Sequence, residues 1–270
     1  MSSIKEIRTK FLQEKIINLF CRGTISESIR EIDNFAKRKI LVLAPHTDDE
    51  VIGCGGLIKK FSSSSSNVYV LFVTVEDERA IVKPTYIKGK NKRIIESENA
   101  KKYLNYTSQF YLEIPERNIE HNAQFKNEIT NTILNLLYKY EIDTMLIPNF
   151  YDMNPDHRII SKIGLTAIPN GYLLKSIFLY EVWGPVNATH ACLLNKKEFD
   201  NKINAMKCYE TQLSSVDYFN IINLISSIRL KDYSLLYPES IKKLLPYSIE
   251  FYECIEQSNI SNYLKKNLAI

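Results

Sequence analysis

Short apolar runs alternate along the chain with segments in which apolar residues recur at helical spacing. The runs, which are rich in branched side chains, predict strands at residues 39–45, 68–75, 110–114, 143–149 and 176–183. Helical spacing predicts helices at residues 53–61, 92–104 and 128–140 and from Asp156 onward. Because such alternation is typical of parallel sheets, we predict an α/β fold with a Rossmann-like, mostly parallel sheet and helices on both faces.

Further elements precede and follow this core. Apolar residues between Ile4 and Lys39 fall at helical spacing, with an interruption at Gly23 and a candidate cap at Ser26, which predicts two helices. Residues 217–252 are Tyr-rich and irregular; they serve core packing, which we favour, or a wall of a substrate site. We predict an N-terminal helical segment at residues 1–38, an α/β domain at 39–212 and a C-terminal extension at 213–270 that packs on the same domain.

Composition and charge narrow the class of protein. Hydrophobic residues make up 45% and charged residues 24% of the 270 residues, as in an ordinary globular protein. The 35 Lys and Arg residues barely exceed the 31 Asp and Glu residues and are scattered, so nothing favours a nucleic-acid partner. No stretch approaches the roughly 18 apolar residues of a membrane span, and the N-terminus lacks a signal-peptide core. We expect a cytoplasmic protein without a membrane partner, and leave open whether it forms a homo-oligomer.

The most unusual string is Pro-His-Thr-Asp-Asp-Glu-Val-Ile-Gly-Cys-Gly-Gly at residues 45–56, directly after the first predicted strand. The adjacent carboxylates of Asp48, Asp49 and Glu50 repel one another, and a fold tolerates such a cluster at a partly buried edge mainly when a cation neutralises it. The alternative is a solvated turn whose acids cap the following helix.

Two histidines favour the metal interpretation. His46 and Asp49 lie three residues apart, so that an imidazole nitrogen and a carboxylate oxygen can reach one divalent ion, and zinc suits this mixed set. A catalytic zinc takes three protein ligands, and His157 follows another strand that ends near Asn149. Ligands bind outside the carboxyl ends of such strands. We therefore predict a site for Zn²⁺ or another divalent metal formed by His46, Asp49 and His157.

These residues resemble a known family. The string at 46–50 resembles the His-Pro-Asp-Asp-Glu signature of the LmbE/PIG-L deacetylases, and Asn-Pro-Asp-His at 154–157 resembles their second motif, His-Pro-Asp-His. Weaker similarities extend the resemblance over residues 39–212. They comprise Arg93, Glu96, Ala100 and Leu104, the string Tyr-Glu-Val-Trp-Gly-Pro at 180–185, and Lys202, Ala205, Tyr209 and Gln212.

The resemblance implies a zinc-dependent deacetylase of the LmbE/PIG-L fold, with His46, Asp49 and His157 as ligands and Asp48 as the general base. The implied substrate is a small molecule with an N-acetylated amino sugar, such as a sugar conjugate or an aminoglycoside-type intermediate, which yields acetate and a free amine. It also implies a sugar-contacting role for Asp77.

Arg93 falls on a helix of the family pattern. We interpret Arg93 as a substrate-binding residue that holds hydroxyls or a carboxylate at the sheet edge. The alternative is a surface ion pair with Glu96 or Glu98.

Two positions depart from the family motifs. Thr47 replaces a Pro, and Asn154 replaces a His that is thought to stabilise the oxyanion or to protonate the leaving amine. Asn154 can donate a hydrogen bond but cannot supply a proton, so Asp156 or a tyrosine near Tyr151 becomes the candidate acid. The departure keeps two alternatives open, a metal-dependent hydratase on the same scaffold and a catalytically inactive sugar-binding protein. Retention of all three ligands and of Asp48 argues against the second.

Overall fold

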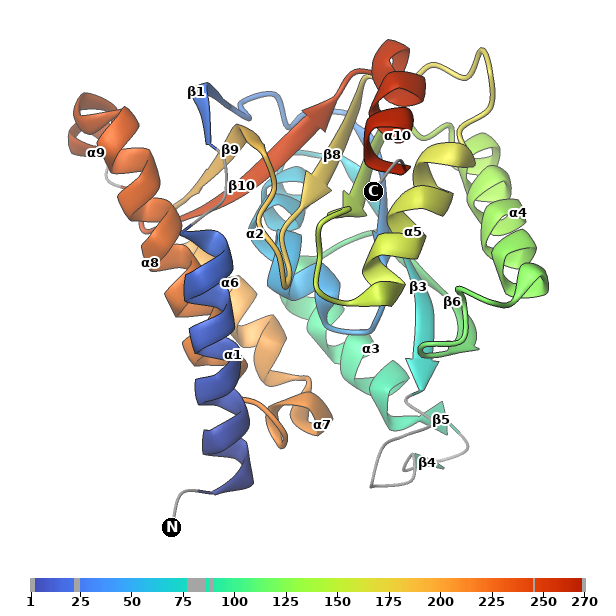
Figure 1. Ribbon diagram of the computed structural model, residues 1–270, viewed down its shortest axis with the longest axis horizontal. Coiled ribbons are helices and arrows are strands. Elements are labelled where there is room, and N and C mark those ends of the chain that lie inside the picture. Colours follow the sequence, from blue (N-terminus) through green and yellow to red (C-terminus); the bar gives the residue numbers. More distant parts are fainter. Residues whose placement is uncertain (1–2, 22–24, 77–85, 88–89, 245, 269–270) are drawn as a thin grey trace.

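The computed structural model describes residues 3–21, 25–76, 86–87, 90–244 and 246–268. Its centre is an eight-stranded sheet in the order β1-β9-β10-β8-β7-β2-β3-β6, with helices on both faces (Figure 1). The sheet strands are β1 (Ile25–Glu31), β2 (Lys39–Ala44), β3 (Asn67–Glu76), β6 (Ser108–Pro115), β7 (Thr144–Pro148), β8 (Ser176–Tyr180), β9 (Ala188–Leu194) and β10 (Ser248–Ile255). Two short strands, β4 (Tyr86–Ile87) and β5 (Lys90–Asn91), pair with each other.

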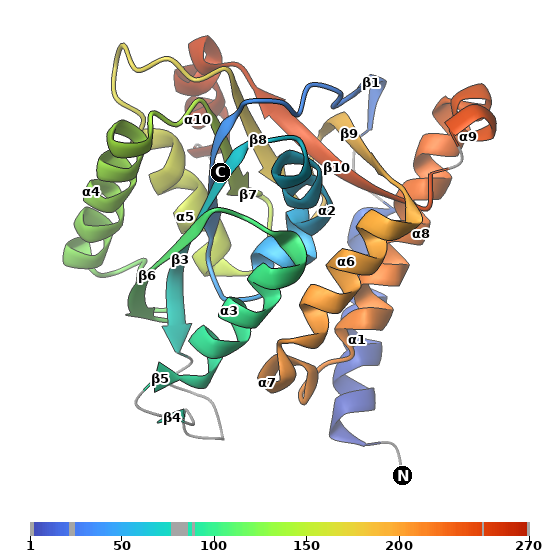
Figure 2. The same cartoon turned by 180° about the vertical axis from the view of Figure 1, so that it is seen from behind.

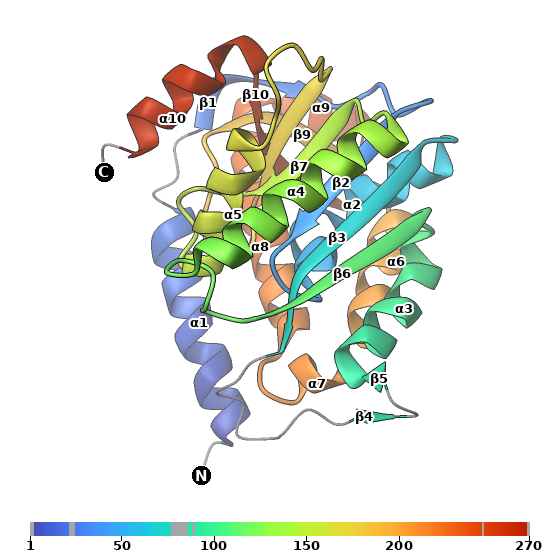
Figure 3. The same ribbon diagram turned by 90° about the vertical axis from the view of Figure 1, so that its right-hand side faces the viewer.

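The helices form two layers, as Figures 2 and 3 show. They are α1 (Ile4–Phe20), α2 (Asp49–Ser63), α3 (Lys92–Leu104), α4 (Ala123–Tyr140), α5 (Pro155–Thr166), α6 (Lys196–Lys207), α7 (Glu210–Leu213), α8 (Tyr218–Leu236), α9 (Pro238–Leu244) and α10 (Ile260–Leu268), with a 3₁₀ turn at Gln257–Asn259. Helices α2, α3 and α6 cover one face of the sheet, and α4 and α5 cover the other. No helix in the described part of the chain is long and apolar enough to cross a membrane.

Alternation along β2 explains why both faces are covered. Ile40 and Val42 point into the core beneath α2, whereas Leu41 and Leu43 point into the core beneath α4 and α5, and all four are fully buried. A strand that is apolar on both sides needs a layer of helices on each. All strand pairs of the eight-stranded sheet are parallel except those of β10, which runs antiparallel to β8 and β9, so the predicted mostly parallel α/β sheet is confirmed.

The prediction of two helices before the first strand is wrong in its second part. Residues 25–31 form β1, which pairs in parallel with β9, so Ser26 caps no helix. The spacing of Ile25, Ile29 and Ile32 fits one face of a helix, but hydrogen bonding to the edge of the sheet satisfies the backbone groups of this segment instead. The pairing partner is more than 150 residues away in the sequence, beyond the reach of a local pattern.

The C-terminal segment is more regular than its sequence indicates. The stretch interpreted as irregular contains α8, a helix of 19 residues, and most of β10. Strand β10 lies between β9 and β8 (Figure 1) and so completes the sheet from within. Residues 213–270 therefore contribute to the same core as residues 39–212.

Helix α2, which carries the acidic motif, is interrupted at Cys54, whose backbone (φ −141°, ψ 20°) is not helical. The carboxylate of Glu250 on β10 accepts hydrogen bonds from the backbone N–H groups of Gly56 and Leu57, at 2.8 and 2.9 Å. Lys202 Nζ donates to the same carboxylate at 2.6 Å and balances its buried charge. Strand β10 thus holds the second half of α2 on the sheet.

Close packing explains Gly53, one of the three glycines in this helix. A Cβ atom at Gly53 would lie 2.2 Å from Cδ2 of Tyr180 and 2.9 Å from the carbonyl oxygen of Glu181. The Tyr180 ring cannot easily move because its hydroxyl donates to the carbonyl oxygen of Leu43 at 2.7 Å. At Gly55 the nearest atom is Cγ of the flexible Lys202 side chain, at 3.2 Å.

We expect Gly53→Ala to lower the free energy of unfolding by about 1–3 kcal/mol, because overpacking strains a filled core. Gly55→Ala is the matched control on the same helix. Alanine has a higher helix propensity than glycine, and this gain should offset the mild contact with the Lys202 side chain. Urea unfolding of both variants measures the difference. Equal midpoints for Gly53→Ala and Gly55→Ala would contradict the packing argument.

Candidate metal centre

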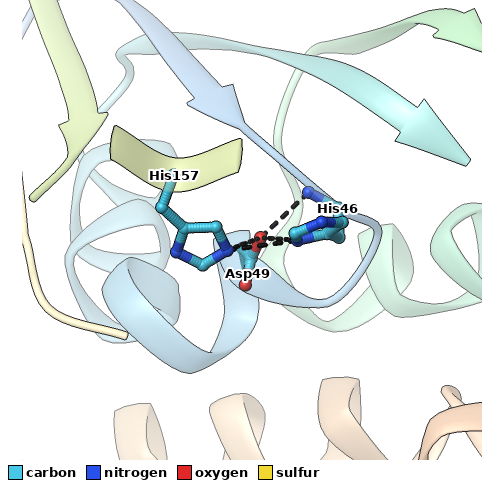
Figure 4. Close-up of side chains that lie close together, drawn as sticks. All are labelled: His46, Asp49 and His157. Atoms are coloured by element: carbon cyan, nitrogen blue, oxygen red, sulfur yellow. Dashed lines mark hydrogen bonds and ion pairs between the residues drawn. The ribbon is translucent and has the colours of Figure 1, made fainter. Parts of the chain in front are cut away.

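Two loops bring the acidic motif and the second histidine together. The first loop joins β2 to α2, and the second joins β7 to α5. Because β2 and β7 are parallel neighbours, their carboxyl ends lie at one edge of the sheet. His46 comes from the first loop, Asp49 is the first residue of α2, and His157 is on the first turn of α5; their side chains point toward one another (Figure 4).

Three donor atoms converge in a nearly equilateral triangle. His46 Nδ1 lies 3.0 Å from Asp49 Oδ2 and 3.1 Å from His157 Nε2, and His157 Nε2 lies 3.1 Å from Asp49 Oδ2. All three side chains are buried. Donors about 2.0–2.2 Å from a tetrahedral zinc lie roughly 3.3–3.6 Å apart, so the triangle accommodates the ion with adjustments of a few tenths of an ångström. Two nitrogens and one oxygen also match the donor set of catalytic zinc sites.

A carboxylate lies behind each imidazole. His46 Nε2 is 3.3 Å from Asp156 Oδ2, and His157 Nδ1 is 3.2 Å from Asp152 Oδ2. Metal-binding histidines usually direct their other ring N–H to a carboxylate, which fixes the tautomer and the ring orientation. This arrangement leaves His46 Nδ1 and His157 Nε2 as the nitrogens that face Asp49, the third candidate ligand.

Backbone groups hold both supporting carboxylates. Asp152 accepts hydrogen bonds from the backbone N–H groups of Asn154 and Trp183, each at 2.8 Å. Asp156 accepts one from the backbone N–H of Arg117, also at 2.8 Å. Sequence reasoning missed Asp152. The sequence could have indicated Asp152 only as an acid that lies close to His157, because a histidine that binds a metal usually has a carboxylate partner.

The electrostatics of the centre favour a cation. Burial alone lowers the pKa of His157, but the charges of Asp152 and Asp49 outweigh it and raise the pKa to about 9. The pKa of His46 is also raised, since Asp49 and Asp156 outweigh its burial. Burial raises the pKa of Asp49, but the two imidazoles bring it below its usual range. The same negative potential that raises both pKa values attracts a divalent ion.

Asp48 adopts an unusual backbone conformation beside the three donors. Its φ is +129°, a region that residues with a side chain rarely occupy. The backbone N–H of Asp48 donates to Glu50 Oε2 at 3.1 Å, and Tyr209 donates to Glu50 Oε1 at 2.5 Å. Strain of this kind persists when the surroundings hold it in place, and it is concentrated at functional sites. Tyr209 belongs to the C-terminal part of the predicted family pattern, so the structure connects that part to the acidic motif.

The Asp48 carboxylate remains available for chemistry. Its side chain is 5% exposed and makes no hydrogen bond to another residue in the described part of the chain. Burial and the adjacent Asp49 carboxylate raise the pKa of Asp48 well above its usual range, against the opposing charges of Arg93 and His46.

Arg93 braces the motif loop. Its Nε donates to Thr47 Oγ1 at 3.0 Å, its Nη2 donates to the Thr47 carbonyl at 3.4 Å, and its Nη1 pairs with Glu116. Among the described residues, Arg93 therefore pairs with Glu116, and not with Glu96 or Glu98 as the alternative interpretation of the sequence expected. Asp77, for which the family resemblance implies a sugar contact, lies outside the described residues.

The candidates for an acid lie in different places. Asn154 caps α5, where its Oδ1 accepts from the backbone N–H of Asp156 at 2.9 Å. Asp156 faces His46, and Tyr151 is 44% exposed. Of these side chains, only Asp156 contacts a member of the donor triangle in the described part of the chain.

We expect Asp152→Asn to weaken zinc binding about 10–100-fold, the usual cost of removing a carboxylate behind a metal-bound histidine. The carboxamide keeps the shape of the side chain but loses the negative charge that faces His157 Nδ1. Competition with a chromophoric chelator measures the zinc affinity. Asp200→Asn, at an exposed ion pair with Lys196, is the control, and equal affinities in the two variants would contradict a supporting role for Asp152.

The fold and the site define an α/β protein with a buried two-histidine, one-aspartate centre at the carboxyl edge of its sheet. Residues 41–168 match the model of the PIG-L family, described as GlcNAc-PI de-N-acetylase. This segment, which carries the three donors of the site, is thus similar to the LmbE-like family. The family resemblance seen in the sequence is therefore confirmed.

Individual relatives agree with this assignment. Diacetylchitobiose deacetylase of Thermococcus kodakarensis is 26% identical over 137 residues, which are 48% of this chain and 49% of the relative. The chain thus matches about half the length of that curated relative.

Solved structures extend the similarity of fold over most of the chain. N,N'-diacetylchitobiose deacetylase from Pyrococcus horikoshii has a TM-score of 0.59 and 17% identity, over 96% of this chain and 95% of that chain. The 4-carboxy-2-hydroxymuconate hydratase GalB from Pseudomonas putida has a TM-score of 0.63 and 14% identity, over 81% of this chain and 96% of that chain. The same fold therefore occurs in proteins named for two different reactions.

Proposed function

We propose that this protein is a zinc-dependent N-deacetylase that hydrolyses the acetamide of a small molecule containing an amino sugar. The products are acetate and a free amine. The observation that carries the proposal is the triangle of His46 Nδ1, Asp49 Oδ2 and His157 Nε2, in which a carboxylate lies behind each imidazole. The names of the curated relative and of the Pyrococcus structure support the choice of an N-acetylated sugar as the substrate class.

His46, Asp49 and His157 would hold the metal. When bound there, zinc lowers the pKa of a water molecule and polarises an acyl oxygen. The same donors accept other divalent ions, because imidazole and carboxylate ligands do not select zinc alone.

Asp48 is the general base in this proposal. Its carboxylate makes no hydrogen bond to another described residue and lies next to the donor triangle, so it can accept a proton from the attacking water. Attack on the acyl carbon forms the new C–O bond, and the C–N bond breaks as the amine takes up a proton. Asn154 has no proton to supply and Asp156 is engaged by His46, so Asp48 returns the proton it received.

Acetate release from a panel of N-acetylated sugars and aminoglycosides tests the proposal. The protein is stripped with a chelator and then reloaded with zinc, so that each preparation serves as a control for the other. Zinc-dependent release of acetate is the expected result. Bound zinc without acetate from any acetamide would contradict the proposal and favour the hydratase or the inactive sugar-binding protein.

A further inference from the structure

Tyr218, the first residue of α8, lies near the metal centre but outside the segment that matches the family model. Its ring packs against Trp183, with 5.8 Å between the ring centroids. The backbone N–H of Trp183 in turn donates to Asp152, the carboxylate that faces His157. Tyr218 therefore packs against a residue whose backbone binds one of the carboxylates that surround the donor triangle.

The hydroxyl of Tyr218 has no partner within the described ranges. The residue is 7% exposed, and its hydroxyl makes no hydrogen bond to any described residue. The charged groups that influence it are those of the centre, namely Asp48, Asp49, Arg93 and Glu116. Burial and the two aspartates raise the pKa of the phenol well above its usual value, so the group keeps its proton and remains a donor.

We propose that the Tyr218 hydroxyl donates a hydrogen bond to the acyl oxygen of the substrate as negative charge develops there. This inference rests on the proposed function. The family motif places an imidazole at the position of Asn154, and Asn154 Oδ1 is used here to cap α5. A neutral phenol whose ring is held against Trp183 is a preorganised donor, and donors of this kind act most strongly where charge appears during the reaction.

Helix α1 positions this tyrosine. Thr9 is 5% exposed, and its Oγ1 accepts from the backbone N–H of Asp217 at 2.9 Å and donates to the Lys5 carbonyl at 2.8 Å. Asp217 also caps α8 through the backbone N–H of Asn220, at 3.2 Å. Helices α1 and α8 lie along each other in Figures 1 and 2. Thr9 is thus a positioning residue for the start of α8.

The test compares Tyr218→Phe with the wild type in the zinc-loaded protein. We expect kcat/KM for acetate release to fall about 100-fold, the usual effect of removing one oxyanion donor, with zinc affinity and melting temperature unchanged. The affinity for a methylphosphonamidate analogue of the best substrate, which mimics the tetrahedral state, should fall by a similar factor while KM changes little. Tyr233→Phe is the matched control, because Tyr233 lies in the last turns of the same helix and packs against Tyr237.

A second pair of variants tests the positioning. Thr9→Val should lower kcat and weaken binding of the analogue, and Thr9→Ser should restore both, because serine keeps the hydroxyl that accepts from Asp217. If the wild type releases acetate and Tyr218→Phe retains its rate and its affinity for the analogue, the role of Tyr218 is overturned and the proposed function stands. If the zinc-loaded wild type releases no acetate, the proposed function fails, and this role of Tyr218 fails with it.

Discussion

Asp48→Asn is expected to reduce kcat for acetate release by a factor of about 10³, within the range for loss of a general base. The carboxamide cannot accept the proton that leaves the attacking water. Asparagine has the same shape and tolerates positive φ better than most residues, so the strained backbone at Asp48 should persist. Steady-state kinetics measure the loss, and metal analysis should find the same zinc content as in the wild type.

The control for this variant is Asp200→Asn, which makes the same chemical change at an exposed position on α6. It should retain wild-type kinetics. Wild-type kcat in Asp48→Asn would remove Asp48 from the mechanism, and a loss of zinc in that variant would give Asp48 a role in metal binding instead.

His157→Ala is expected to abolish both zinc binding and the stabilisation that zinc provides. At a free zinc concentration a thousandfold above its dissociation constant, the wild type should gain about 4 kcal/mol in the free energy of unfolding. For a chain of this size the gain corresponds to a rise in melting temperature of roughly 10 °C. The variant keeps only His46 and Asp49 from the donor triangle, so its melting temperature should not respond to zinc.

Thermal unfolding with zinc and with a chelator measures this difference. His121→Ala is the control, because His121 is exposed and matches neither motif. An equal response to zinc in His157→Ala and in the wild type would show that the ion binds elsewhere, and would remove the basis for the proposed chemistry.

Local sequence patterns determined the class of fold and the residues of the candidate metal centre. Branched apolar runs and helical spacing describe which side of each segment is apolar, and their alternation is enough to indicate a parallel sheet with two helical layers. His46 and His157 follow two such runs, β2 and β7. Because the carboxyl ends of parallel strands share one edge, the meeting of these histidines with Asp49 followed from the fold class.

Only the tertiary structure decided which distant segments pair. The apolar spacing around Ile29 fits a helix, and the backbone hydrogen bonds to β9 made that segment a strand. Strand β10 entered the middle of the sheet through pairing with β8 and β9, which its Tyr-rich sequence does not encode.

The tertiary structure also decided which residues surround the metal centre. Asp152 behind His157, Glu116 beside Arg93, and Tyr218 against Trp183 join parts of the chain through side-chain contacts. Motif spacing identifies residues that can reach one ion, because these residues lie on short loops that directly follow predicted strands. The residues that orient these ligands come from other loops and helices, and their positions depend on packing that no local pattern records.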